Sequence, residues 1–338
     1  MDHRTAVSPA VLLRIWLLCL AVVAVGCTAE PAEQPAPFTD TDVTFDADGL
    51  TIHGSYRAGP EPGPAALLIS ESGPTDRNGD NAVVGPIGNM RQLADLLSER
   101  GVASLRYDKV GTGATGLGPY EQNPQDVGSA VYTTGARAAL TFMADQPATD
   151  PDRISVYGLG EGAVHALRLA DGADEGTPRV HSLGLLQPPP RRYLDIITER
   201  VRADSSPETL AAWLAAVDQA RTRGTAPDQL PDGLGAILNP GNVKAVVEAD
   251  SVDPLALAAR VPAGTPVLLT CSDTDAQSDC AEIQPLADAL AHTDLTVVYL
   301  GGVNHVLRDD PTDNVANYAQ QSPLSPQLEA AVDRFVRK

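Results

Sequence analysis

Short apolar runs recur along the chain, and stretches with a helical spacing of apolar residues lie between them. Several runs are apolar at successive positions, which is expected for parallel strands that helices cover on both faces. The runs that predict strands are AALLIS at 65–70, VASLRY at 102–107, ISVY at 154–157, SLGLLQ at 182–187, PVLLT at 266–270 and LTVVYL at 295–300. Their alternation with helices predicts an α/β fold with a doubly wound, mostly parallel sheet.

Three helices and a hairpin complete this pattern. The hairpin is predicted where VTF and LTIHGSY flank the turn at Asp48 and Gly49. The first helix starts at a pair that resembles a capping box, Asn89 and Gln92. Its apolar face consists of Met90, Leu93, Leu96 and Leu97. The other two helices are expected at about 126–144 and at 161–170.

The alternation stops between residues 191 and 260. Apolar residues there repeat at helical spacing with no strand-like run between them, in Tyr193, Ile196, Ile197 and Val201 and again in Leu210, Trp213, Leu214 and Val217. We interpret 191–260 as a helical cap inserted into the sheet domain, which divides that domain into 43–190 and 261–338. The alternative is a group of surface helices with no part in a pocket.

The first 26 residues have the pattern of an export signal, with a basic start and an apolar run from Ile15 to Val25 that is too short to span a membrane. The sequence AVGC that ends at Cys27 resembles the bacterial lipobox, in which the cysteine is diacylated. We therefore expect a signal peptide over 1–26 and an extracytoplasmic protein anchored to the cell membrane by lipidated Cys27. The alternative is an ordinary secretory signal. Residues 27–42, rich in Pro, Ala and acidic residues, predict a flexible tether.

Charge and cysteine content narrow the choice of partners and compartment. The formal net charge of −20 argues against nucleic acid and against electrostatic attachment to anionic lipid, so membrane contact is expected through the lipid anchor only. Cys271 and Cys280 remain once Cys19 leaves with the signal and Cys27 is lipidated. An even pair in an oxidising compartment predicts a disulfide, and the alternative is two free thiols. No cofactor and no metal site is indicated.

The candidate chemistry begins at the stretch ISVYGLGEGAVHAL at 154–167. A strand, the pentapeptide GLGEG and then a helix resemble the nucleophile elbow of α/β hydrolases, in which Gly-x-Ser-x-Gly raises a serine above the sheet on a strained turn. The glycines on either side of that serine let strand and helix pass closely. In this chain the serine position holds Gly160.

Further motifs extend the resemblance over residues 43–336. The loop ISESGPTDRNGDN at 69–81, the turn RYDKVGTG at 106–113, DPDRISVYG at 150–158, the stretch that ends in CSDTD at 271–275 and LGGVNHVLRD at 300–309 are similar to segments of bacterial α/β hydrolases related to serine aminopeptidases and acyl-ester hydrolases. Together they identify the chain as resembling that superfamily and imply its fold.

The resemblance implies a base and an acid at the carboxyl edge of the sheet. It makes His305 the general base and Asp275 its orienting acid, since each follows a predicted strand and can meet the other above that edge. Asp273 is the rival for the acid, because the same loop also offers Asp273 and Asp279.

The same resemblance places the oxyanion hole at two backbone N–H groups. One belongs to Glu161 and the other lies near Glu71 or Ser72, in the loop after the strand at 65–70. Glu71 stands where the family has glycine, and a carboxylate there would disfavour a developing oxyanion. Ser72 is the one nearby hydroxyl that we would test as a substitute nucleophile, and His165 is expected to pack rather than to react.

With Gly160 at the nucleophile position, three functions are considered. The loss of a serine nucleophile lowers turnover about a million-fold, which favours a non-catalytic or very weakly active protein that binds a small acyl or peptide-like ligand, or a protein partner. The alternatives are a hydrolase of esters or amides that activates water with His305 and Asp275, and a non-hydrolytic enzyme that uses this pair as a base. From sequence alone, Gly160→Ser should restore esterase activity if the remaining site is intact.

Overall fold

The computed structural model describes residues 38–171, 176–275 and 277–337. The predicted signal peptide, the predicted lipidation site Cys27 and most of the predicted tether lie outside the described residues. Among the residues described, no helix has both the length and the apolar character needed to cross a bilayer.

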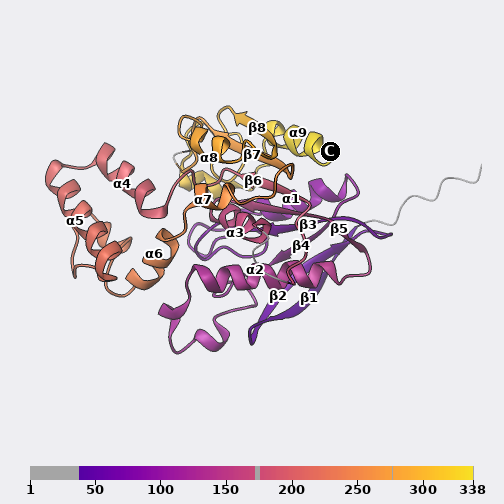
Figure 1. Ribbon diagram of the computed structural model, residues 1–338, viewed down its shortest axis with the longest axis horizontal. Coiled ribbons are helices and arrows are strands. Elements are labelled where there is room, and N and C mark those ends of the chain that lie inside the picture. The colour runs from indigo at the N-terminus through magenta and orange to yellow at the C-terminus, as the bar shows by residue number, and fades with distance from the viewer. Residues whose placement is uncertain (1–37, 172–175, 276, 338) are drawn as a thin grey trace, which may run out of the picture. The chain divides into compact units, whose positions relative to one another are not determined.

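The core is one eight-stranded sheet with the order β1-β2-β4-β3-β5-β6-β7-β8 (Figure 1). The hairpin of β1 and β2 and the pairing of β2 with β4 are antiparallel, and every pairing from β4 to β8 is parallel. The strands are β1 (Thr39–Ala47), β2 (Leu50–Ala58), β3 (Gly63–Ile69), β4 (Ala103–Tyr107), β5 (Thr149–Leu159), β6 (Ser182–Leu186), β7 (Pro266–Ser272) and β8 (Asp294–Leu300). This confirms the doubly wound, mostly parallel sheet that the sequence predicts.

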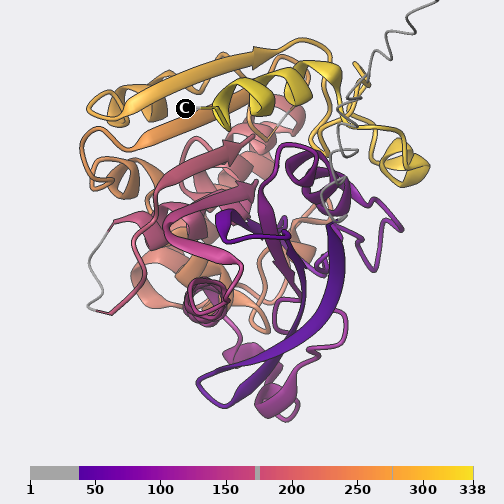
Figure 2. The same ribbon diagram turned by 90° about the vertical axis from the view of Figure 1, so that its right-hand side faces the viewer.

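Helices cover both faces of the sheet, as the doubly apolar strands require. Neighbouring residues of β3 illustrate this, because Leu67 belongs to one hydrophobic cluster and Leu68 to the other. The first cluster receives side chains from α2 (Ser129–Ala144), α3 (Glu161–Ala170) and α8 (Gln284–Ala289). The second receives them from α1 (Asn89–Ser98) and α9 (Pro326–Phe335). Figure 2 shows the sheet from the indigo hairpin to the gold edge strand, with the yellow α9 close to β8.

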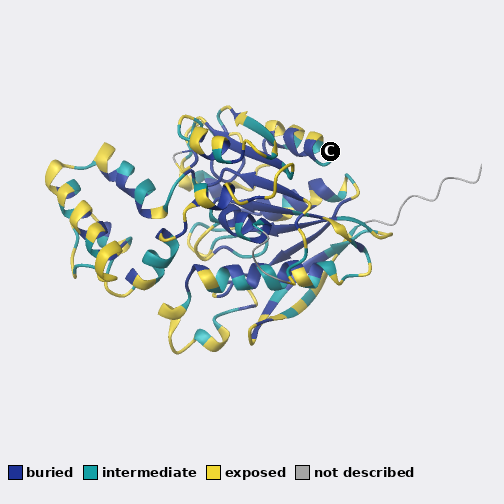
Figure 3. Cartoon of the chain, viewed as in Figure 1, coloured by how far each residue is buried: buried dark blue, intermediate teal, exposed yellow. Residues whose placement is uncertain are grey.

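The segment between β6 and β7 is helical, with no strand among its described residues. Its elements are α4 (Tyr193–Asp204), α5 (Pro207–Arg223), the 3-10 turn η3 (Leu234–Ala236), α6 (Val243–Asp250) and α7 (Pro254–Ala258). Apart from α7, they share a small core around the fully buried Trp213. Figure 3 shows that the strands are mostly buried, whereas α4 and α5 alternate buried and exposed positions. This is the amphipathic pattern that the sequence predicts for a cap.

Three local expectations differ from the structure. Residues 39–42, assigned to the tether, already pair with β2, because Asp40 forms an ion pair with Arg57. The second helix starts at Ser129 rather than near 126, where a 3-10 turn η2 (Pro124–Asp126) stands instead. Asn89 and Gln92 form no capping box. The residue before α1 is Gly88, which has a left-handed backbone conformation, and no side chain caps the first turn of the helix.

Side chains of α6, in the inserted helical segment, contact the start of α2. The backbone N–H of Ala130 donates to the carboxylate of Glu248, and the side chain of Lys244 contacts Asp126. Both Glu248 and Lys244 belong to α6. An acceptor that caps a helix from 118 positions away in the chain leaves no local sequence signal.

Candidate active site

The elbow between β5 and α3 has the strained geometry that its sequence predicts. Gly160 lies between the two elements with φ 53° and ψ −120°. A Cβ atom on Gly158 would lie 2.2 Å from the carbonyl carbon of Gly162, and one on Gly162 would lie 2.4 Å from the carbonyl oxygen of Ile69. Both flanking glycines are therefore required for strand and helix to pass.

The loops after β7 and β8 bring His305 and Asp275 together. The His305 Nδ1–H donates to Asp275 Oδ2 at 2.7 Å, and Asp275 Oδ1 accepts from the backbone N–H of Gln277, also at 2.7 Å. Asp275 is 1% exposed. The rival Asp273 accepts instead from the backbone N–H of Gly302 at 2.8 Å. Of the two carboxylates that the sequence leaves open, the structure places Asp275 against the imidazole.

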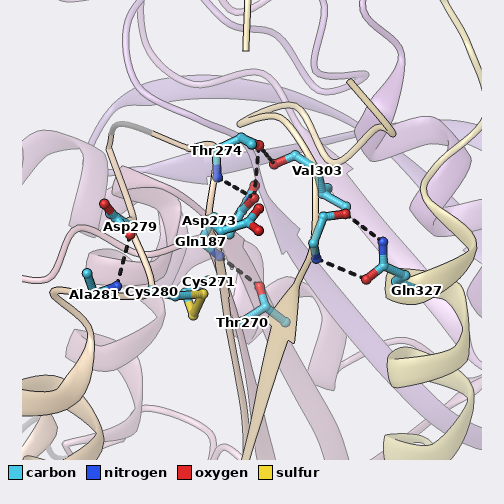
Figure 4. The surroundings of a disulfide bond; sticks show 12 residues. Gln187, Thr270, Cys271, Asp273, Thr274, Asp279, Cys280, Ala281, Val303 and Gln327 are labelled. Carbon is cyan, nitrogen blue, oxygen red and sulfur yellow. Dashed lines mark hydrogen bonds between the residues drawn. A yellow bond between two sulfur atoms is a disulfide. The ribbon is translucent and has the colours of Figure 1, made fainter. Parts of the chain in front are cut away.

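A disulfide between Cys271 and Cys280 closes the loop that carries Asp275, which confirms the predicted bridge (Figure 4). The bonded sulfurs connect the end of β7 to a segment in which Asp279 accepts from the backbone N–H of Ala281 at 2.9 Å. In the same view, the Thr274 hydroxyl donates to the carbonyl oxygen of Val303 at 3.1 Å. The loops that bear Asp275 and His305 are thus fastened to each other beside the site.

The carboxylate of Glu71 fills the position of the missing nucleophile. Its Oε2 atom accepts from His305 Nε2 at 2.8 Å. A Cβ atom built on Gly160 would lie 1.4 Å from the same oxygen, a separation equal to a carbon–oxygen bond rather than to a contact. Glu71 Oε2 therefore stands about where a serine hydroxyl oxygen at position 160 would stand.

The second oxygen of Glu71 occupies the oxyanion hole. Oε1 accepts from the backbone N–H of Ser72 at 2.5 Å and from that of Glu161 at 3.4 Å. These are the two donors expected to stabilise an oxyanion. The structure does not place Ser72 as a replacement nucleophile, because the ring nitrogens of His305 contact Asp275 and Glu71.

The three groups form an ion pair network that protonates the imidazole. Burial alone would lower the pKa of His305, but the carboxylates of Asp275 and Glu71 outweigh burial and raise this pKa well above its usual value. Burial would raise the pKa of Glu71, whereas the charge and hydrogen bond of His305 and the hydrogen bonds of Ser72 lower it to about 2. At neutral pH we therefore expect an imidazolium between two carboxylates.

Two further ionisable groups lie behind this network. The ammonium of Lys109 donates to the backbone carbonyl oxygen of Glu71, and burial lowers the pKa of Lys109. His165 is 2% exposed and contacts the Thr133 hydroxyl at 3.0 Å. Burial and the charge of Lys109 lower the pKa of His165 to about 3, so this histidine is neutral and packs, as expected. The role of Lys109 is not predicted by the sequence.

A cavity of about 410 Å³ lies above Glu71, Gly160 and His305. Its walls are mainly apolar and come from the core and from the cap helices α4 and α6. The apolar lining residues are Val127, Val164, Pro189, Ile196, Ile197, Ala245, Val246, Ala249, Val252 and Pro254. A concave, mostly apolar space of this size with a few polar groups at one end is typical of small-molecule sites. Among the described residues, no group of three or more His, Cys, Asp or Glu side chains is arranged to hold a metal ion.

Comparison with known proteins identifies the fold. No protein-family model and no curated protein matches the sequence. Solved structures do match, among them the esterase Pf2001 of Pyrococcus furiosus, with 17% identity over 89% of this chain and 90% of that chain and a TM-score of 0.56. The α/β hydrolase GrgF from Penicillium sp. sh18 matches with 18% identity over 88% of this chain and 98% of its own, and a TM-score of 0.57. The protein has the α/β-hydrolase fold.

A third neighbour with this fold, Est1E from Butyrivibrio proteoclasticus, has 16% identity over 88% of this chain and 99% of its own, and a TM-score of 0.53. Within the α/β-hydrolase fold, the condition attached to the expectation for Gly160→Ser can be examined. That expectation requires an intact site, and a Cβ atom on residue 160 would lie 1.4 Å from Glu71 Oε2, so the serine position is free only if the Glu71 carboxylate moves away.

Proposed function

We propose that this protein binds a ligand in the pocket of an α/β-hydrolase fold and does not carry out serine-dependent acyl transfer. One observation carries the proposal: the Glu71 carboxylate takes the nucleophile position with Oε2 and the oxyanion hole with Oε1. Acyl transfer requires a nucleophile, a base and a free oxyanion hole. A single side chain occupies the first and third places and keeps the base protonated.

The same contacts disfavour water activation by His305 and Asp275. A general base needs a free lone pair on the nitrogen that faces the substrate. The Nε2 atom of His305 instead donates to Glu71 at 2.8 Å, and both neighbouring carboxylates favour the charged ring. We therefore propose that His305 positions Glu71 rather than accepting a proton from water.

The cavity supports ligand binding as the remaining role. Residues of the cap contribute much of its wall, and the cap is tied to the core beside it through Glu248 and Lys244. Asp250, which is 1% exposed, also accepts from Arg192 and Arg221 and so connects α4, α5 and α6. A braced pocket without an assembled acyl-transfer site supports the proposed ligand binding.

We expect no active-site labelling when the native protein is treated with a fluorophosphonate probe, because its phosphorus needs a serine oxygen to attack it. Intact-protein mass spectrometry measures the adduct, and a serine esterase treated in parallel shows that the probe is active. Stoichiometric labelling of a residue that lines the cavity would overturn the proposed function.

We also propose that the protein is exported and anchored by acylated Cys27. The disulfide between Cys271 and Cys280 supports this, since such bonds persist in oxidising compartments. In cells that process lipoproteins, we expect the protein in the membrane fraction, with a diacylglyceryl mass on its N-terminal peptide. Cys27→Ala should release it from that fraction. Equal membrane retention of both forms would contradict the anchor.

A further inference from the structure

The floor of the cavity presents acceptors where a hydrolase presents donors. The backbone N–H groups of Ser72 and Glu161 and the Nε2–H of His305 all donate to the Glu71 carboxylate. Lys109 donates to the backbone carbonyl of the same residue. The hydrogen-bond donors that would hold an ester carbonyl are therefore engaged already, and the carboxylate oxygens of Glu71 and Glu161 remain to face a ligand.

Two acidic side chains line the cavity, Glu71 and Glu161. Of these two, Glu161 has no charged partner within hydrogen-bonding distance among the described residues. Its closest recorded basic group is His165 Nε2 at 4.0 Å, and that ring is neutral because burial and Lys109 lower its pKa to about 3. The Glu161 side chain is 32% exposed and lines the cavity. Burial and the neighbouring charge of Glu71 raise the pKa of Glu161, although Lys109 opposes this. A cation in the cavity would relieve that repulsion.

Two aromatic rings stand beside Glu161. Tyr132 and Tyr193 both line the cavity, and burial together with the Glu161 carboxylate raises the pKa of each phenol. The faces of tyrosine rings attract ammonium groups. Lys109 Nζ already lies 5.8 Å from the centre of the Tyr132 ring, so Tyr193 is the ring left for a ligand. The carboxylate of Glu161 beside Tyr193, with apolar walls around the cavity, suits a positive headgroup on an apolar body.

The cavity is lined by both acidic and basic side chains. Glu71, Glu161 and His305 line the cavity beside Gly160, whereas Asp275 and Lys109 are buried and are not among its lining residues. The cavity is also lined by Arg191, which pairs with Glu282 at 2.8 Å, and by Arg200 on α4. Glu71 and Glu161 are thus the carboxylates that a ligand can meet next to Gly160, and Arg191, Arg200 and His305 are the basic residues of the same lining.

We infer that the cavity takes a primary alkylammonium ligand, with its headgroup at Glu161 and Glu71 and its apolar chain between α4 and α6. The inference rests on the proposed function, because a working serine site would keep its donors free for a carbonyl oxygen. It also distinguishes this pocket from one for an acyl ester or a fatty acid, whose headgroups are acceptors and would face the two carboxylates.

The test compares three ligands of equal chain length on the full-length protein by titration calorimetry: octylammonium chloride, 1-octanol and sodium octanoate. A charged hydrogen bond in a partly buried site is worth about 1.5 kcal/mol or more, so octylammonium should bind at least about tenfold more tightly than octanol. Octanoate should bind most weakly. Octanoate affinity equal to or greater than that of octylammonium, or no octylammonium binding, would overturn the inference.

A matched pair of variants separates the site from general attraction to an acidic protein. Glu161→Gln should weaken octylammonium binding about tenfold, whereas Glu208→Gln, which removes the same charge from an exposed position near the start of α5, should leave it unchanged. Equal effects of the two variants would overturn the inference. If Glu161→Gln does not fold, the order of the three ligands on the native protein still decides.

The two proposals fail in different ways. Octanoate binding without ammonium binding would reject the ligand class and leave a non-catalytic binding protein. Fluorophosphonate labelling of the native protein would reject the proposed function whichever ligand binds.

Discussion

The double variant Glu71→Gly/Gly160→Ser is expected to react covalently with a fluorophosphonate probe, while each single variant remains at background. Removal of the Glu71 carboxylate frees both oxyanion donors and removes one of the two charges that keep His305 protonated. Serine at 160 then supplies an oxygen close to the present position of Glu71 Oε2, which lies 2.8 Å from His305 Nε2. The elbow already has φ 53° and ψ −120°, so no rearrangement of the backbone is required.

The single variants are the controls, and each fails for a different reason. Gly160→Ser alone directs its Cβ to within 1.4 Å of Glu71 Oε2, so the carboxylate must move and the protein should lose stability. Glu71→Gly alone opens the hole but provides no hydroxyl. Because loss of a serine nucleophile costs about a million-fold in turnover, even a partly rebuilt site should exceed both single variants in short-chain ester hydrolysis by about a thousandfold. A folded double variant that remains unlabelled would show that the rest of the site is not competent.

The sequence predicts the fold well because most of the determining interactions repeat along the chain. Strands that must be covered on both faces are apolar at successive positions, as Leu67 and Leu68 show by joining opposite clusters. The start of α2 escapes prediction because its cap is the Glu248 side chain of α6. The early start of β1 escapes it because polar residues such as Asp40 are held by ion pairs with Arg57 and Arg106.

The site is predictable where one short motif determines the geometry. The elbow follows from its glycines, and the positions of His305 and Asp275 follow from the strands that precede them. The choice between Asp275 and Asp273 depends on which backbone N–H groups fold onto each carboxylate, and the sequence does not determine this.

The sequence predicts the position of Glu71 but not its full role. Its position beside the oxyanion hole follows from the loop motif, but its contacts depend on the side-chain conformation and on residues 90 and 234 positions away. The one local signal was that an acidic residue and a glycine each stand at a position where the family has another residue. An added carboxylate and a removed hydroxyl at neighbouring points of one site suggest that one group replaces the other.

Glu71→Gln is expected to lower the pKa of His305 and to destabilise the protein most between pH 4.5 and 6.5, which are the ordinary pKa values of the two groups. The lowered pKa of Glu71 stabilises the native state above pH 4.5, and this contribution is lost as pH falls towards about 2. The raised pKa of His305 stabilises it fully below pH 6.5, and that contribution is lost as pH rises through the pKa in the folded state. Within the window, loss of the charged hydrogen bond should cost about 2 kcal/mol.

Urea unfolding of both proteins across pH measures this difference in the free energy of unfolding, and ¹⁵N chemical shifts of the imidazole report the titration of His305 directly. Glu208→Gln, with the same change of charge at an exposed site, should show no such maximum. A native His305 that titrates near 6.5, or a stability difference that is flat across pH, would mean that no imidazolium lies between Asp275 and Glu71. His305 Nε2 would then carry no proton at neutral pH and could accept one from water, so the dyad would be competent as a general base.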